Sequence, residues 1–194
     1  MRGRLLLVAT RALGGYCDAV AAALHERHPD ARDLRGALSV ALCADGEMAV
    51  ELGTSVRGRD VFLFAGSARN ALGLPSSECK LETYHAVDAL RRAQAGRISL
   101  FEPYCGPGRS DRPTRRNSVG LWMHLKTLVE LGVDHYLTFQ LHSEKSGTFI
   151  DPVRCAVDDL PAHVLLKAHL CETAIGTVER HRARRGLASA SSCA

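Results

Sequence analysis

The sequence predicts a three-layer α/β domain, in which a mostly parallel sheet of about five strands has helices on both faces. Short continuous apolar runs, such as residues 98–101, are typical of strands buried on both sides of a parallel sheet. Helical patterns separate these runs, and strand–helix alternation is characteristic of α/β domains. The length of 194 residues suits one domain with a substantial core.

The first half of the chain begins with an apolar run at 5–9, which we expect to be a strand, and a helical pattern at 16–28. Two short apolar runs follow, and the Asp-Gly pair between them is a turn signal, which predicts a small hairpin or flag within residues 37–53. Residues 60–65 have the pattern of a buried strand. Residues 66–78 are rich in Gly, Ser, Asn and Pro, which predicts a loop.

The second half starts with an apolar stripe at helical spacing from Ala86 to Ala93, followed by the predicted strand at 98–101. A second helix is expected at 119–131, where Gly132 provides a stop signal. The next expected elements are a strand at 135–141, a polar turn at 143–147, an irregular stretch from Phe149 to Pro152, and a helix from Pro161 to about Arg180. We therefore expect one domain over residues 1–182 and a basic, small-residue tail over 183–194.

Composition argues against several classes of function. The net charge of +4 is mild, and arginine gathers mainly at 109–116 and 180–185, without a basic face interleaved with aromatic residues; nucleic acid is therefore not an expected partner. The seven cysteines are scattered and contain no CxxC pair, which favours reduced structural thiols. No apolar run approaches the ~20 residues of a membrane span. We expect a soluble, cytoplasmic protein.

Polar residues follow several predicted strands, and ligands of open α/β sheets bind at the carboxyl ends of strands. The loop after 98–101 contains Gly106, Gly108, Arg109, Asp111 and Arg112, which suits a phosphate-bearing ligand; a solvated surface loop is the alternative.

Two further candidates lie in other loops. His142 closes a predicted strand, where an imidazole can ligate a metal or donate to a phosphate, although a histidine there is often only structural. Asp45 lies in the hairpin turn, where local turn chemistry alone also favours Asp.

Several segments together resemble the N-terminal half of the phosphoribosyl pyrophosphate synthetase (ribose-phosphate pyrophosphokinase) family over about residues 4–172. The matching segments are ADGE (44–47), SVRGRDVFLF (55–64), VDALRRAQAGRI (87–98), PYCGPGRSDR (103–112), GVDHYLTFQLH (132–142) and, more loosely, FIDPVRCAVDDL (149–160). The resemblance implies a phosphoribosyltransferase-like domain. It also implies the family reaction, in which diphosphate passes from magnesium ATP to ribose 5-phosphate in nucleotide biosynthesis.

The resemblance implies roles for individual residues. Asp45 and Glu47 fall where the family holds adenine with a turn from a neighbouring subunit, so self-association is expected. Arg109 and His142 fall where the family contacts the ATP phosphates and their Mg²⁺, which makes them the candidate catalytic residues and His142 the candidate metal ligand. Ser110 and Asp111 continue the same loop motif and are candidate nucleotide-binding residues.

Three departures from the family pattern lie in the nucleotide site. Ser110 replaces a Gln and is too short for the same amide contacts, and Cys43 replaces an aromatic residue that stacks on adenine. Gln140 replaces an Asp near the metal, and Mg²⁺ prefers carboxylate or water ligands. Each change is expected to weaken the binding of the nucleotide.

The sequence also contains neither the family's acidic pair followed by Thr-Gly-Gly-Thr nor its catalytic loop with Lys and Arg. We therefore expect that this chain does not make phosphoribosyl pyrophosphate alone. One hypothesis is half of a split enzyme completed by a C-terminal-half chain. Another is a non-catalytic regulatory or assembly subunit of a complete synthetase. The third is a module that binds ATP or ADP for another acceptor.

Overall fold

The computed structural model describes residues 3–31, 33–171 and 173, and the chain divides into two compact units, Met1–Leu160 and Pro161–Ala194. In the second unit, residues 162–171 are helical. The predicted end of the helix near Arg180 and the predicted tail at 183–194 lie outside the described residues, so the predicted domain boundary stays a prediction.

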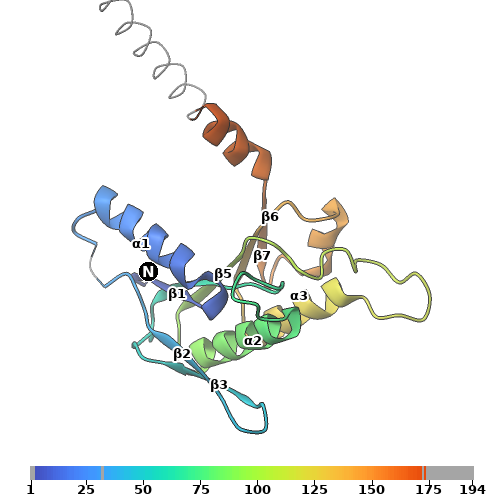
Figure 1. Ribbon diagram of the computed structural model, residues 1–194, viewed down its shortest axis with the longest axis horizontal. Coiled ribbons are helices and arrows are strands. Elements are labelled where there is room, and N and C mark those ends of the chain that lie inside the picture. The colour runs from blue at the N-terminus through green and yellow to red at the C-terminus, as the bar shows by residue number, and fades with distance from the viewer. Residues whose placement is uncertain (1–2, 32, 172, 174–194) are drawn as a thin grey trace, which may run out of the picture. The chain divides into compact units, whose positions relative to one another are not determined.

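The first unit contains a five-stranded sheet in the order β1-β4-β5-β6-β7, and every neighbouring pair of its strands is parallel (Figure 1). Its strands are β1 (Leu5–Ala9), β4 (Asp60–Phe64), β5 (Arg97–Glu102), β6 (His135–Phe139) and β7 (Ala156–Leu160). The helix α1 (Gly14–Arg27) covers one face, whereas α2 (Ser76–Arg92) and α3 (Gly120–Leu131) cover the other (Figure 1). This arrangement confirms the predicted three-layer α/β fold with a mostly parallel sheet.

The core has two parts because alternate side chains of each strand point to opposite faces of the sheet. On β1, Leu7 and Ala9 pack in the cluster beneath α1, which includes Cys17, and Leu6 and Val8 pack in the cluster beneath α2 and α3. Both faces are therefore apolar, which explains why the central strands read as continuous apolar runs.

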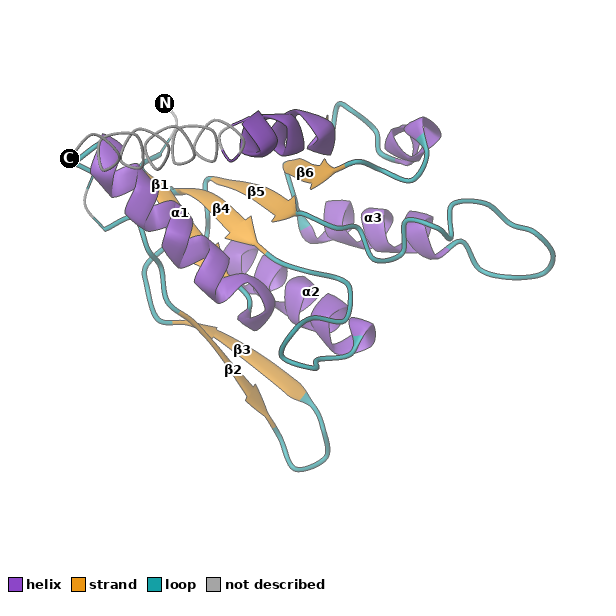
Figure 2. Cartoon of the chain, turned by 45° about the horizontal axis from the view of Figure 1, so that its top comes forward, coloured by secondary structure: helices purple, strands orange, loops and turns teal. Residues whose placement is uncertain are grey.

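The predicted hairpin forms from β2 (Leu38–Leu42) and β3 (Met48–Leu52), and it projects away from the main sheet (Figure 2). Gly46 has a φ of +90° in its turn, a conformation that favours glycine. Met48 is buried, and Leu38 and Val50 pack against the main core, so the base of the hairpin is anchored while its turn is exposed.

Helix α2 begins earlier than the sequence pattern predicts, so the predicted loop at 66–78 is too long by three residues. Pro75 occupies the position before the first helical residue, and the Ser76 hydroxyl donates to the Ser67 carbonyl at 2.6 Å. These two features start the helix within a segment whose composition is typical of loops.

The last strand, β7, was not predicted: the sequence analysis expects only an irregular stretch from Phe149 to Pro152 before the helix at Pro161. Its residues are exposed or half-buried, since β7 lies at the edge of the sheet and carries Asp158 and Asp159. Charged residues are common on edge strands, where they also remove the apolar signal from the sequence.

Two shorter helical turns complete the described fold, η1 (Arg11–Leu13) and η2 (Glu144–Phe149), and the latter includes most of the predicted turn at 143–147. None of the described helices has the length and apolar character needed to span a membrane.

Candidate functional site

A small pocket of about 140 Å³ lies where the loop after β5 meets the end of β6. Its lining comprises Tyr104, Cys105, Gly108, Arg109, Gln140, Leu141 and His142. Because β5 and β6 are neighbouring parallel strands, their carboxyl ends lie at the same edge of the sheet. The structure therefore brings together Arg109 and His142, two residues that the sequence places 33 positions apart.

The charge of the pocket comes from Arg109, an exposed side chain that has no ion-pair partner among the described residues. His142 is also exposed. A Cβ added to Gly108 would lie 3.0 Å from the Cys105 carbonyl oxygen and 3.7 Å from the Cβ of His142, so the backbone of Gly108 packs tightly against Cys105 and lies beside His142. A guanidinium without a carboxylate partner is well suited to bind an anion.

Gln140 has a φ of +52°, which is unusual for a residue other than glycine. Its backbone N–H donates to the Leu160 carbonyl at 3.2 Å, and the next N–H, that of Leu141, donates to Oδ1 of Asp159 at 3.0 Å. The edge strand β7 thus holds the turn after β6, whose residues Gln140 and Leu141 line the pocket. Strained backbone of this kind gathers at functional sites.

Ser110 and Asp111 follow Arg109 but do not line its pocket. The Ser110 hydroxyl accepts a hydrogen bond from the N–H of Gly120 at 2.9 Å, and so caps the start of α3. Asp111 lines a separate, largely apolar pocket of about 380 Å³ together with Trp122 and other residues. Nucleotide binding by Ser110 and Asp111 stays a prediction.

Asp45 and Glu47 are exposed at the hairpin turn, where Oδ1 of Asp45 accepts the N–H of Glu47 at 3.1 Å. This contact is local turn chemistry, as the sequence allowed. Neither residue lines the pocket of its own chain, and their expected role in a neighbouring subunit's site stays a prediction. In the part of the chain that the structure describes, no group of three or more His, Cys, Asp or Glu residues is arranged to hold a metal.

A buried polar network that sequence reasoning missed surrounds Glu102, the last residue of β5. Glu102 is 2% exposed, and its carboxylate contacts three side chains. The Ser67 hydroxyl donates to Oε1, while Tyr136 OH donates to Oε2 at 2.7 Å and His124 Nε2 lies 3.0 Å from Oε2. Tyr84 OH lies 2.8 Å from Nδ1 of the same imidazole. The sequence signal was a glutamate that directly follows the run at 98–101.

The network shifts the acidity of its neighbours. Burial, with a contribution from the Glu102 charge, raises the pKa of Tyr84 to about 12 and the pKa of the Cys105 thiol to about 12. The same two causes raise the pKa of Tyr136 well above its ordinary value. The Cys105 thiol at the pocket therefore stays protonated at neutral pH, which argues against a nucleophilic role.

The free energy of unfolding should fall as the pH rises above about 9. The folded chain keeps Cys105 and Tyr84 protonated toward pH 12, whereas the unfolded chain releases these protons near 9.0 and 10.0. Below pH 9 both states hold the protons, so neither group makes stability depend on pH. The Cys105 thiol above pH 9, and the Tyr84 hydroxyl above pH 10, each lower the free energy of unfolding by about 1.4 kcal/mol per pH unit. Urea denaturation between pH 8 and 10.5 measures the slope. In Cys105→Ala the decline between pH 9 and 10 should be shallower but not absent, because burial also raises the pKa of the Cys155 thiol to about 11. An unchanged profile would contradict the assignment.

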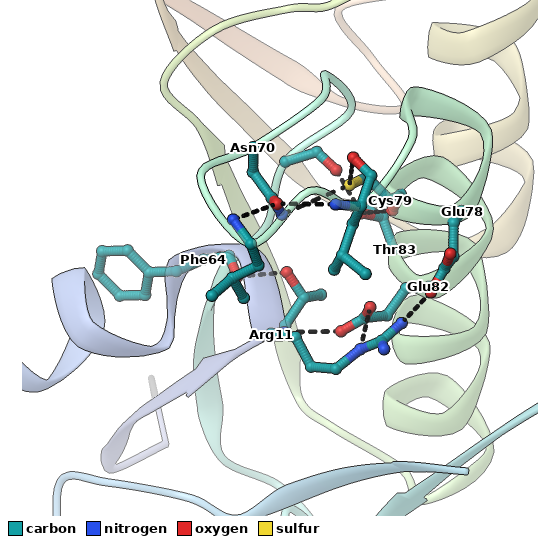
Figure 3. Close-up of polar contacts among 11 residues, drawn as sticks. Arg11, Phe64, Asn70, Glu78, Cys79, Glu82 and Thr83 are labelled. Atoms are coloured by element: carbon teal, nitrogen blue, oxygen red, sulfur yellow. Dashed lines mark hydrogen bonds and ion pairs between the residues drawn. The ribbon is translucent and has the colours of Figure 1, made fainter. Parts of the chain in front are cut away.

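A second polar cluster joins the segment after β1 to α2 (Figure 3). The backbone N–H of Arg11 donates to Oε1 of Glu82 at 2.6 Å, and Nε donates to Oε2 at 2.9 Å. The same guanidinium donates to Oε1 of Glu78 at 2.7 Å. Because these groups satisfy one another, the cluster is a structural brace rather than a binding site.

The comparisons with known proteins agree on one family. A family model described as the N-terminal domain of ribose phosphate pyrophosphokinase matches residues 20–132. Ribose-phosphate pyrophosphokinases from Vibrio parahaemolyticus and Neisseria meningitidis are 37% and 39% identical over 118 residues, which is 60% of this chain. The alignments cover 36% and 35% of those proteins, so the chain spans about a third of the length of these curated relatives.

The structural comparison covers more of the chain. The crystal structure of phosphoribosylpyrophosphate synthetase from Mycobacterium smegmatis matches with a TM-score of 0.73 and 28% identity, covering 87% of this chain and 52% of that one. This structural likeness covers more of the chain than the family model does. The chain therefore belongs to the ribose phosphate pyrophosphokinase family, and it matches the N-terminal domain of that family.

Proposed function

We propose that this chain binds the phosphates of ATP or ADP in the 140 Å³ pocket and provides the nucleotide half of a ribose-phosphate pyrophosphokinase reaction. The observation that carries the proposal is that Arg109 and His142 line one pocket, while Arg109 has no acidic partner in the described part of the chain. The relatives named above supply the reaction class.

Transfer of a diphosphate group depends mainly on positioning and on neutralising the charge of the phosphates. The Arg109 guanidinium would donate to phosphate oxygens, and the imidazole of His142 would add a second contact. Because Gly108 has no side chain, the phosphates could approach the backbone of the pocket there. These residues bind and orient the nucleotide, and they require an acceptor placed beside it.

Magnesium fits the pocket poorly as a metal held by the protein. The lining offers the Gln140 amide and the His142 imidazole but no carboxylate, and Mg²⁺ prefers carboxylates and water. If Mg²⁺ enters with the nucleotide, the phosphates would hold it, and His142 would be the pocket imidazole available to it.

Ribose 5-phosphate is proposed to bind to a different segment or chain, since the 194-residue sequence contains no acidic pair followed by Thr-Gly-Gly-Thr. The 194-residue chain alone should release no AMP from ATP and ribose 5-phosphate, and AMP release should appear once a chain with that motif is added.

The second candidate is a non-catalytic regulatory or assembly subunit of a complete synthetase, which the lack of a carboxylate in the pocket favours. Addition of this chain to a complete synthetase would then change that enzyme's activity.

Arg109→Ala should weaken the binding of MgATP by about 1 to 3 kcal/mol, or about 5- to 150-fold in Kd, because one charge-assisted contact is lost. Isothermal titration calorimetry measures the change. Arg112→Ala is the matched control, since Arg112 is an exposed cation of the same loop that does not line the pocket. Equal losses in the two variants would indicate a general effect of charge and remove Arg109 from the site.

A further inference from the structure

We propose that the buried carboxylate of Glu102, acting through the hydroxyl of Ser67, is the positioning group for the loop that carries Arg109. The link is a hydrogen bond from the backbone N–H of Gly106 to Oγ of Ser67 at 2.8 Å. The relevance of this link to nucleotide binding rests on the proposed function, but the link itself is a property of the ligand-free chain.

The bonds around Glu102 form a chain with one direction. Because a carboxylate only accepts, we assign the imidazole proton of His124 to Nε2, which faces Glu102, and this leaves Nδ1 to accept from Tyr84 OH. Ser67 donates its only proton to the same carboxylate. The lone pairs of Ser67 Oγ are therefore left to accept from the loop. Removing the carboxylate would free the Ser67 hydroxyl to rotate, and the Gly106 amide would lose a fixed acceptor.

The contact between the loop and Ser67 is unusually close. A Cβ on Gly106 would lie 2.5 Å from the carbonyl oxygen of Ser67 and 2.8 Å from its carbonyl carbon, so only glycine permits this approach. Ser67 is fully buried, and its carbonyl accepts a hydrogen bond from Ser76 at the start of α2. The acceptor of the Gly106 amide is thus held by the sheet and by a helix.

Two successive turns connect Gly106 to Arg109. The N–H of Gly108 donates to the Cys105 carbonyl at 3.0 Å, and the N–H of Ser110 donates to the Pro107 carbonyl at 2.8 Å. Arg109 lies within the second turn. Because the turns leave little freedom between Gly106 and Arg109, fixing the first fixes the backbone of the second.

A buried carboxylate is costly, and a well-packed apolar residue is often as stable at such a position. A role limited to core stability predicts that substitutions at Glu102 and Ser67 affect all slow-exchanging amides alike. A positioning role predicts an effect confined to the loop.

The test is amide hydrogen exchange in the ligand-free 194-residue chain, followed by NMR. Ser67→Ala removes the acceptor and should speed exchange of the Gly106 amide about ten-fold, while the Gly108 amide, bonded to Cys105, changes less. Glu102→Gln should give the same pattern. Ser67→Thr, which keeps the hydroxyl, should restore slow exchange at Gly106.

Glu82→Gln is the matched control, because Glu82 is an equally buried carboxylate whose partners are Arg11 groups rather than the loop. It should leave the exchange of Gly106 unchanged relative to the core amides. Equal acceleration of all protected amides in Ser67→Ala, or no acceleration at Gly106, would overturn the proposal.

Titration with MgATP separates this proposal from the proposed function. Where the wild-type chain binds, Ser67→Ala should raise Kd several-fold and Ser67→Thr should restore it. If the wild-type chain does not bind, the proposed function fails, and the exchange rates at Gly106 still decide whether Glu102 and Ser67 position the loop.

Discussion

Replacing His124 by leucine should lower the free energy of unfolding by about 3 kcal/mol. The imidazole is 2% exposed and lies 3.0 Å from Oε2 of Glu102, while its other nitrogen is the partner of Tyr84 OH. Leucine fills similar space but leaves a buried carboxylate and a partly buried phenol each short of a partner, and such losses are among the largest single-residue effects. Urea denaturation at pH 7 measures the change.

His135→Leu is the control for this prediction. His135 also pairs with a carboxylate, since its Nε2 lies 2.8 Å from Oδ2 of Asp158, but that carboxylate side chain is 55% exposed. Water can replace the lost contact, so the expected loss is below about 1 kcal/mol. Combining His124→Leu with Glu102→Gln should cost less than the sum of the two single changes, because the charge that lacks a partner is gone. Additive losses, or similar losses for the two histidines, would contradict the network.

Arg11→Met should lower the free energy of unfolding by about 2 to 3 kcal/mol. Methionine keeps much of the length of the side chain but removes the guanidinium contacts to Glu82 and Glu78, leaving Glu82 with the backbone N–H of residue 11 (Figure 3). Glu82 is 1% exposed, and a buried carboxylate that loses its cation is strongly destabilising.

The same urea experiment includes Arg35→Met as its control. Arg35 pairs with Asp18 at 2.7 Å, but the side chain of Asp18 is 64% exposed, so the pair should contribute less than about 1 kcal/mol. The double variant Arg11→Met with Glu82→Gln should recover part of the loss. If Arg11→Met and Arg35→Met lowered the free energy of unfolding by the same small amount, the contacts between the segment after β1 and α2 would not contribute measurably to stability.

The sequence predicted most of the fold because the central strands are buried on both faces and the helices carry regular apolar stripes. In α2, Cys79, Thr83, Ala86, Val87 and Leu90 are all buried and recur at helical spacing. Gly132 ends α3 with a φ of +109°, as its position after the apolar stripe predicted. Local sequence patterns were sufficient to predict an element wherever its buried residues recur at regular spacing.

The predictions from sequence were wrong where tertiary contacts, rather than the local sequence pattern, determine the secondary structure. The edge strand β7 has little burial and therefore little apolar signal. The end of β6 is set by the positive φ of Gln140 and by bonds to β7, neither of which local composition shows.

In the candidate site, too, some features could be predicted from the sequence and others depend on the folded structure. The topology of neighbouring parallel strands made it predictable that Arg109 and His142 would lie together, and they line one pocket. Ser110, whose side chain caps α3, could not be separated from Arg109 by sequence position alone. Glu102 was missed because its three partners come from three separate segments of the chain, and only the folded structure brings them together.

Calorimetric titration of the purified chain with ATP and Mg²⁺ decides whether the pocket binds a nucleotide. We expect saturable binding with one nucleotide per pocket, weakened in Arg109→Ala and retained in Arg112→Ala. Absence of saturable binding by the folded wild-type chain, or binding that is indifferent to Arg109, would contradict a nucleotide site at the carboxyl ends of β5 and β6.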